Sequence, residues 1–398
     1  MTWKELPAGP GRCLEILTEA GWAAYPVGGW VRDLLLGREP GDVDVCTAAR
    51  PETVLELFPS AVPTGLKHGT VTVPTADGAV EITTFRRETG YADGRHPDAV
   101  IFDAGLTEDL ARRDFTINAM ALAEDGTVID PFGGREDLER RRIRCVGEPG
   151  RRFGEDALRM FRAVRFAAQL GFDWEENTAA AIRRQAPLAA RLSAERVRVE
   201  VEKTLLSPRP GLAGAFFELG LMAGLPAQWP EGAFSLTRLP AQGLERWAGL
   251  CACLLESGII SDCAAFLSGM KLDRRTVRAC RAGEVLWRTG LPGEAGGWRR
   301  ALSRCGAEAC RAAAAMGAVT GVPAAPAALE KVLAGDPCVA PAGLALSGGD
   351  LAALGYSGPE VGRAQRRLLD HVLDMPEDNT RERLLALLKS EENCDRDR

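Results

Sequence analysis

The hydrophobic pattern of the chain changes near Gly150, and this change limits the folds open to it. Before that residue, alternating strand-like stretches mix with helical ones, whereas the longer remainder has helical periodicity broken by Gly and Pro. The pattern predicts an α+β protein, with a head of mixed sheet and helices followed by all-α segments. A chain of 398 residues is too long for one core, and we expect two to four compact units.

The Gly- and Pro-rich breaks suggest where these units begin and end. They predict a head at 1–145, a helical neck at 146–206, a helical body at 207–325 and a helical tail at 326–398. Only the polar end, Glu391 to Arg398, has a composition that favours disorder.

Composition excludes several classes of protein. A hydrophobic share of 46% with 26% charged residues is that of an ordinary soluble protein, and we find no signal-like or membrane-spanning apolar segment. The sequence therefore predicts a cytoplasmic protein without a membrane partner. The eleven cysteines are scattered without a C-x-x-C pair and with only three histidines, which favours buried, reduced thiols over a zinc site.

Charge indicates where nucleic acid would bind. The net charge of -6 argues against a uniformly basic surface. Between Arg135 and Arg165, however, ten arginines accompany six acidic residues, and this local surplus predicts contacts with RNA phosphates.

The head contains a candidate metal site. Asp42 and Asp44 lie two apart in an alternating stretch, so a strand would present both carboxylates on one face, as Mg²⁺ ligands require. Gly69–Val73 and Ala79–Arg86 flank a hairpin turn, and Glu81 on the second strand would complete the site if that strand lies beside the aspartates. Alone, each carboxylate is equally typical of a solvated strand edge.

A phosphate-binding turn precedes the aspartates. Gly28 and Gly29 end a predicted strand and open a helix, so bare backbone N–H groups would face an incoming anion. Arg32 in the first helical turn can bind a phosphate. Asp114 and Asn118 have simpler interpretations as a helix cap and a backbone partner.

Five motifs in order resemble the class II CCA-adding enzymes of the polymerase beta nucleotidyltransferase superfamily, over about Leu14 to Leu388. They are Gly28-Gly29-Trp30-Val31-Arg32-Asp33 with Gly41-Asp42-Val43-Asp44, Arg112-Arg113-Asp114-Phe115-Thr116-Ile117-Asn118-Ala119, Asp130-Pro131-Phe132-Gly133-Gly134, and Glu155-Asp156-Ala157-Leu158-Arg159. The resemblance implies a polymerase-beta-like head that transfers nucleotides from CTP and ATP to the 3′ end of tRNA. It also implies two Mg²⁺ ions held by Asp42 and Asp44, and a tail that contacts the tRNA elbow.

The resemblance assigns base selection to the neck. Cytosine and adenine both present an amine donor beside a ring-nitrogen acceptor, which an acidic acceptor and an arginine donor can match. Asp156 and Arg159 are three apart and would be neighbours on a helix, at the positions that act as a protein template in the family. Arg32, Arg113, Arg162 and Arg165 are assigned to the nucleotide and its phosphates; without the flanking motifs, the neck arginines would suggest salt bridges on a solvated helix.

Other segments bear on which enzyme of the class this is. Glu88–Pro97, with His96, resembles the flexible loop used in changing from C to A, and it favours full CCA addition. The alternatives are a CC-adding or A-adding specialist, a poly(A) polymerase, or a catalytically silent RNA-binding protein. The segment 207–325 contains no motif that we can place.

Overall fold

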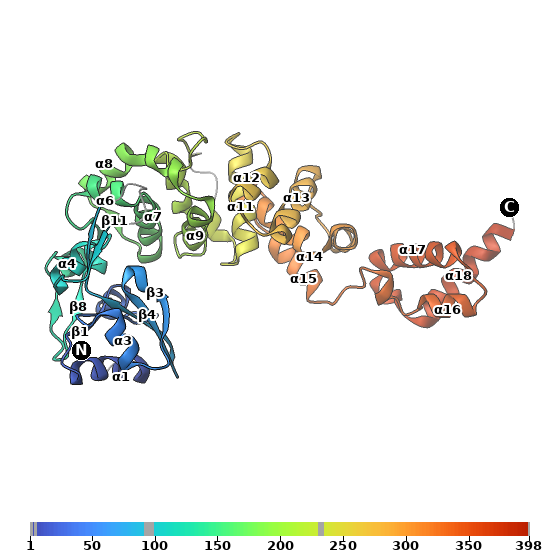
Figure 1. The fold of residues 1–398 in the computed structure, drawn as a ribbon. Helices are drawn as coiled ribbons and strands as arrows, with labels where there is room; N and C mark the ends of the chain where they lie inside the picture. Colours follow the sequence, from blue (N-terminus) through green and yellow to red (C-terminus); the bar gives the residue numbers. More distant parts are fainter. Residues whose placement is uncertain (1–2, 4–5, 91–98, 230–234, 397–398) are drawn as a thin grey trace. The chain divides into compact units, whose positions relative to one another are not determined.

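The computed structural model describes residue 3 and residues 6–90, 99–229 and 235–396, with the side chains of 89 and 391–396 left out. Most of the predicted loop, including His96, therefore lies outside the described residues. The chain forms two compact units, Met1–Gln228 and Trp229–Arg398, which we describe separately (Figure 1).

A seven-stranded sheet organises the head. Its order is β3-β4-β5-β2-β1-β8-β9, formed by β1 (Ala24–Val27), β2 (Asp44–Thr47), β3 (Val62–Gly65), β4 (Thr70–Thr75), β5 (Gly78–Thr84), β8 (Ala121–Leu122) and β9 (Val128–Ile129). The β4–β5 hairpin and the first strand confirm the predictions for these segments. Every pairing is antiparallel except that of β2 with β5.

The parallel pairing brings the predicted carboxylates together. Asp44 is the register partner of Glu81, so the two side chains leave the same face of the sheet. The predicted strand over 42–45 is partly wrong: β2 begins only at Asp44, and Asp42 lies in the segment before it. The alternation still holds, because Val43 and Val45 are buried whereas both aspartates are exposed.

Helices and short ribbons complete the head. They are α1 (Ala8–Glu19), α2 (Gly29–Leu35), α3 (Pro51–Leu57), α4 (Leu106–Ala111), α5 (Gly134–Glu139), the 3₁₀ turns η2 (Leu66–His68) and η3 (Thr116–Asn118), and the ribbon of β6 (Arg87–Thr89) with β7 (Ala99–Ile101). Leu14 and Leu17 of α1 are fully buried, as are Val27 and Ile82 of the sheet.

The neck packs helices against one another. Its elements are α6 (Pro149–Glu155), α7 (Leu158–Leu170), α8 (Glu176–Gln185), η4 (Ala186–Arg191) and α9 (Ala194–Leu205), with β10 (Arg142–Ile143) and β11 (Asp173–Trp174) paired in parallel. The first unit also includes η5 (Pro210–Gly214) and α10 (Ala215–Glu218). These belong to the predicted body, but Phe216 of α10 stacks on Phe161 of α7, with ring centroids 5.3 Å apart. The first compact unit thus extends past the predicted boundary at 207.

The second unit is helical. It contains η6 (Leu236–Arg238), α11 (Gly243–Glu256), α12 (Cys263–Gly269), α13 (Arg274–Thr289), α14 (Ala295–Thr320), α15 (Ala325–Leu333), η7 (Pro341–Gly343), α16 (Gly348–Ala353), α17 (Pro359–Asp374), η8 (Pro376–Asp378) and α18 (Arg381–Arg396). Its buried residues include one apolar cluster around Trp298 and Ala313 and another around Leu346 and Leu368.

The C-terminal segment and the possibility of a membrane-spanning helix were also addressed by the sequence predictions. The expectation of disorder from Glu391 is wrong for most of that segment, because α18 continues to Arg396. In the described part of the chain, no helix is long and apolar enough to cross a membrane.

Candidate active site

A pocket of about 480 Å³ opens between the head and the neck helices of the first unit. Its lining comes from the end of β1, the start of β2, the segment before η3, and the facing helices α7 and α9. The lining residues are Gly28, Gly29, Arg32, Asp44, Arg112, Arg113, Asp114, Asn118, Asp156, Leu158, Arg159, Arg162, Phe166 and Arg196. Eight of the predicted site residues are among them, whereas Asp42, Glu81 and Arg165 are not.

The acidic side of the pocket is short of positive charge. Although the Asp44 side chain is exposed, the surrounding protein removes part of its hydration and thereby raises its pKa; Arg113 opposes that rise, and the negative charges of Glu81 and Asp42 add to it. Among the described residues, no three His, Cys, Asp or Glu side chains converge as a metal cage. The donor set nevertheless fits Mg²⁺, which is typically held by one or two carboxylates together with substrate phosphates.

The turn before α2 has a steric reason to be glycine. Gly28 has a φ of 75°, and a Cβ there would lie 2.8 Å from Nη1 of Arg113. The prediction of bare N–H groups is wrong at this residue, because its N–H donates to the carbonyl of Met120 at 3.2 Å. The turn therefore lets Arg113 approach the backbone closely.

Arg113 forms an ion pair with the buried carboxylate of Asp109. Asp109 on α4 has no exposed surface, and it lies 3.6 Å from Nη2 of Arg113 and 2.9 Å from Nε of Arg112. The Nε of Arg113 is buried and has no hydrogen-bond partner among the described residues. Arg113 thus retains hydrogen-bonding capacity beside Asp44.

A polar chain connects α2 to α7 along the floor of the pocket. Arg32 forms a bidentate ion pair with Asp33, and its Nη1 donates to Oδ1 of Asn118 at 2.6 Å. The Nδ2 of Asn118 donates to Asp114 at 3.2 Å, and Asp114 accepts from Nε of Arg162 at 2.6 Å.

Asp114 does not cap η3 as predicted, since the N-cap of that turn is Phe115. Its carboxylate instead orients Arg162. Burial alone would raise the pKa of Asp114, but the Arg162 charge and the Asn118 hydrogen bond overcome this and lower it to about 2. The structural interpretation of Asn118 also changes, because its side chain bonds to Arg32 and Asp114.

The predicted base-reading pair is not on one continuous helix. Asp156 is extended, with φ -149° and ψ 108°, at the joint between α6 and α7, and only Arg159 is helical. One carboxylate oxygen of Asp156 accepts from the N–H of Leu158 at 3.0 Å, and the other accepts from Nη2 of Arg196 at 2.7 Å. Asp156 therefore joins α7 to α9.

Arg159 is positioned by the same joint. Its Nη1 donates to Oε2 of Glu155 at 2.7 Å and to the carbonyl of Arg152 at 3.1 Å, and its Nη2 donates to the carbonyl of Arg112 at 3.1 Å. A guanidinium has five N–H donors, so among the described contacts two donors remain for a ligand.

Arg165 turns away from the pocket lining. It forms a buried ion pair of 2.6 Å with Glu200 on α9, and its guanidinium lies 4.0 Å from the centre of the Phe166 ring. Arg165 therefore links α7 to α9. Residues spaced three apart shift progressively around a helix of 3.6 residues per turn, so Arg165 need not point in the same direction as Arg159.

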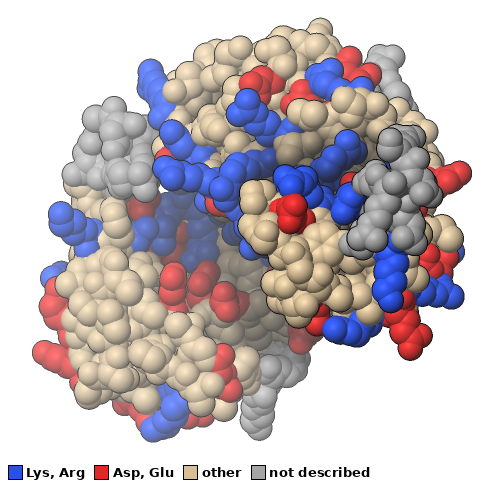
Figure 2. Space-filling view, turned by 90° about the vertical axis from the view of Figure 1, so that its right-hand side faces the viewer, with Lys and Arg blue, Asp and Glu red and all other residues tan. Residues whose placement is uncertain are grey.

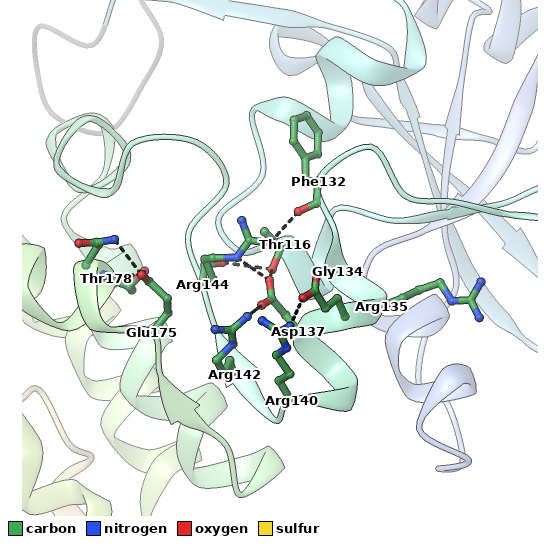
Figure 3. Close-up of polar contacts among 12 residues, drawn as sticks. Thr116, Phe132, Gly134, Arg135, Asp137, Arg140, Arg142, Arg144, Glu175 and Thr178 are labelled. Carbon is green, nitrogen blue, oxygen red and sulfur yellow. Dashed lines mark hydrogen bonds and ion pairs between the residues drawn. The ribbon is translucent and has the colours of Figure 1, made fainter.

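Asp137 is a second buried carboxylate, and it lies outside the pocket lining. Asp137 of α5 accepts from Thr116 at 2.7 Å, from Arg142 at 3.0 Å and from Arg144 at 2.7 Å, and Arg144 also donates to the carbonyl of Phe132 (Figure 3). These bonds tie η3, which carries Asn118, to α5 and β10.

Sequence reasoning missed Asp109, Asp137 and Arg196. The first two carried no signal, because a buried carboxylate and a surface one have the same letter in the sequence. Arg196 lies in the predicted neck, but no spacing in the sequence showed that it reaches Asp156.

Positive charge is gathered locally, as predicted. On the face seen in Figure 2, Lys and Arg side chains cluster in patches with acidic side chains between them. The neck contributes Arg159, Arg162 and Arg196 to the pocket despite the net charge of -6.

Comparison with known protein families finds two models that match separate segments of the chain. The family model of the Poly A polymerase head domain matches residues 24–144, and the model described as the probable RNA and SrmB- binding site of polymerase A matches residues 171–231. The eight lining residues of the pocket from Gly28 to Asn118 lie within the first match, whereas Asp156 and Arg159 lie between the two.

Whole-length relatives are more informative. The CCA-adding enzyme of Geobacillus kaustophilus (strain HTA426) is 41% identical over 95% of this chain and 96% of its own, and that of Limosilactobacillus fermentum (strain NBRC 3956 / LMG 18251) is 40% identical over 92% of each. The crystal structure of the Bacillus stearothermophilus CCA-adding enzyme in complex with CTP has 37% identity and a TM-score of 0.78, covering 97% of both chains. A tRNA nucleotidyltransferase complexed with a primer tRNA and an incoming ATP analog has 26% identity and a TM-score of 0.62 over 81% of this chain and 99% of its own. On this full-length similarity, the chain belongs to the family of class II CCA-adding enzymes.

Proposed function

We propose that this protein adds CCA to the 3′ end of tRNA without a nucleic-acid template, using CTP and ATP. The observation that carries the proposal is one pocket that combines a nucleotidyl-transfer carboxylate, Asp44, with a base-reading acceptor and donor, Asp156 and Arg159. The relatives named as CCA-adding enzymes, and the solved ones with CTP or with tRNA and an ATP analog, support these substrates.

The acidic side of the pocket is assigned to divalent metal, which enzymes of this family generally use, and we propose Mg²⁺. Asp42 and Asp44 would hold the ions, with Glu81 reinforcing the negative field from the neighbouring strand. When bound, two Mg²⁺ ions would assist deprotonation of the tRNA 3′-hydroxyl and neutralise the triphosphate. The part of Asp42 and Asp44 would be to position the 3′-hydroxyl and the phosphates for in-line displacement.

The phosphates would be bound on the opposite side. Arg113 lines the pocket and its charge acts on Asp44, so its guanidinium is placed to donate to an incoming triphosphate. Arg32 and Arg162 are already fixed by Asn118 and Asp114, and their remaining N–H groups can donate without losing rotamer freedom. Gly28 and Gly29 keep that approach free of side chains.

Base choice would depend on Asp156 and Arg159. A carboxylate accepts from the exocyclic amine of cytosine or adenine, and a guanidinium donates to the adjacent ring nitrogen. Uracil and guanine present an acceptor and a donor in the reverse order, which leaves both protein groups mismatched. Arg196 already occupies one oxygen of Asp156, and this contact holds the carboxylate in position.

Primer extension tests this function directly. The purified protein with Mg²⁺ is given tRNA transcripts that end at the discriminator base, at C or at CC, each with CTP, ATP or both. We expect two C additions and one A, in that order, and no further growth. A halt at CC with both nucleotides present would favour a CC-adding specialist, and long A tails would favour a poly(A) polymerase.

A silent RNA-binding protein would show no incorporation on any primer. Separate incubation with UTP and GTP checks base choice, and both should be incorporated far less than CTP and ATP. Equal use of all four nucleotides would contradict the assignment of Asp156 and Arg159.

A further inference from the structure

Two cysteines in α14 are brought together by a break in the helix. Cys305 and Cys310 are five residues apart, a spacing that in a regular helix would point their side chains about 140° apart. Gly306, with φ 81° and ψ 169°, interrupts the helix between them. The two sulfurs consequently lie 3.7 Å from each other.

The two thiols have unequal environments. Cys310 is fully buried in the cluster around Trp298, whereas Cys305 is only partly buried at its edge. A hydrogen bond from Cys310, opposed by burial and assisted by Arg304, lowers the pKa of Cys305 to about 7. The same hydrogen bond together with burial raises the pKa of Cys310. When protonated, Cys305 donates instead to the carbonyl of Ala301 at 3.0 Å.

We propose that Cys305 and Cys310 form a reversible intramolecular disulfide when the protein meets a hydroperoxide. The thiolate sulfur of Cys305 attacks a peroxide oxygen, the O–O bond breaks, and a sulfenic acid forms on Cys305 while the other oxygen leaves as water or alcohol after taking up a proton. The sulfur of Cys310 then attacks that of Cys305, and the hydroxide that leaves takes the Cys310 proton as water. Two thiols are oxidised and one peroxide is reduced.

The remaining described cysteines lack this combination. Cys251 and Cys263 also lie within hydrogen-bonding reach of each other, but both are fully buried, so a peroxide has no access to them. Cys338 is partly exposed, but burial raises its pKa and its thiol donates to the carbonyl of Ala340. Access, a low pKa and a second sulfur coincide only at Cys305 among the cysteines that the structure describes.

The break in the helix also provides room for the bond. A disulfide requires the sulfurs to approach by about 1.7 Å. No atom lies within 4 Å of the position where Gly306 would carry a Cβ, so the backbone can pivot there. Trp298 and Ala301 before the break lie in the same core cluster as Cys310 after it, and Arg299 also donates to the carbonyl of Leu373 in α17. The disulfide would therefore fix the angle between the two halves of α14.

Peptide mapping of the whole protein tests the proposal. The reduced protein is treated with a small excess of hydrogen peroxide, blocked with iodoacetamide and digested with trypsin. Cleavage after Arg304 and Arg311 places both cysteines in one peptide, Cys305–Arg311. We expect this peptide to lose two hydrogens and to resist alkylation, and dithiothreitol to restore two alkylation sites.

Two matched variants show whether the oxidation depends on Cys305 or on another thiol. Cys305→Ser should abolish the two-hydrogen loss, and Cys338→Ser should leave it unchanged. Before oxidation, iodoacetamide at pH 7 should modify Cys305 at least about fivefold faster than Cys338 in the unsubstituted protein. An unchanged peptide mass after peroxide, or faster modification of Cys338, would overturn the proposal, and the second measurement does not depend on any variant folding.

Discussion

Asp44 of the head sheet and the arginines of the neck line one pocket, but their charges are balanced differently. At Asp44, burial is the largest cause of the raised pKa; Arg113 lowers that pKa, and the negative charges of Glu81 and Asp42 raise it further. In contrast, Arg159 and Arg162 each pair with a carboxylate within 2.7 Å. The difference agrees with the proposal that the head carboxylates bind cations from solution, whereas the neck arginines are preorganised by carboxylates of the protein itself.

Removal of Asp44 should have the largest effect. Asp44→Asn keeps the shape of the side chain but loses the negative charge that attracts metal, and we expect nucleotide incorporation to fall by about 100-fold or more. Single-turnover incorporation of CTP with saturating Mg²⁺ measures this. Asp125→Asn, in an exposed turn of the same head, is the matched control and should retain normal rates. Normal activity of Asp44→Asn would contradict the proposal that the negative charge of Asp44 is needed for nucleotide incorporation.

Loss of Asp156 should affect the selection between nucleotides more than the rate of nucleotide incorporation. Asp156→Ala removes the acceptor for the exocyclic amine, and the discrimination of CTP against UTP should drop by about 10- to 100-fold, the value of a bidentate base contact. Competition between the two nucleotides on one primer gives the ratio. Arg196→Ala retains the carboxylate but frees it from α9, so its effect should be smaller. An equal loss in both variants would mean that Asp156 acts only by joining the helices.

Asp137 should matter for stability. Its partners Arg142 and Arg144 are about one third exposed, so Asp137→Asn should lower the free energy of unfolding by about 2 kcal/mol, less than for a wholly buried pair. Urea denaturation measures the change. Glu136→Gln, in the same helix, breaks an exposed pair with Arg140 and should cost under about 0.5 kcal/mol. A similar loss in both variants would contradict the role of buried Asp137.

Asp114 predicts a pH dependence. Its pKa falls from 3.8 to about 2 on folding, so its ionised form stabilises the native state above pH 4, and this stabilisation is lost as the pH falls toward 2. It amounts to on the order of 2 kcal/mol at neutral pH. The difference in unfolding free energy between the unsubstituted protein and Asp114→Asn should therefore shrink between pH 5 and pH 3, and a difference independent of pH would contradict the ion pair with Arg162.

The smallest effect should have the opposite sign. Because the pKa of Asp44 is raised, its ionised form disfavours the folded state at neutral pH. Without metal, Asp44→Asn should have a slightly higher melting temperature than the unsubstituted protein, whereas Asp114→Asn should have a lower one. Thermal unfolding in EDTA compares them, and destabilisation by Asp44→Asn would show that its charge is already balanced by the protein.

Local patterns predicted much of the fold and part of the site. Alternation placed Val43 and Val45 in the core, and the Asp77-Gly78 turn gave the β4–β5 hairpin, because both depend on neighbours in the sequence. The parallel pairing of Asp44 with Glu81 depends on a crossover, which no local pattern encodes.

The neck shows why spacing alone was insufficient. Asp156 and Arg159 were predicted on one helix from their separation of three, but α6 ends before Asp156, whose carboxylate accepts from the N–H of Leu158 at the start of α7. Arg165 has the same spacing from Arg162, yet Glu200 on another helix holds it away from the pocket lining. Partners distant in the sequence decide where these long side chains point.

The parallel pairing of β2 with β5 has a consequence for tolerance to insertion. α3, β3 and β4 all lie between Asp44 and Glu81 in the sequence, yet the two carboxylates are adjacent through backbone hydrogen bonds of their own strands. Extra residues in the exposed turn at Asp77-Gly78 would lengthen the hairpin without displacing either carboxylate. A peptide tag or fluorescent label could therefore be carried at that turn while the enzyme remains active.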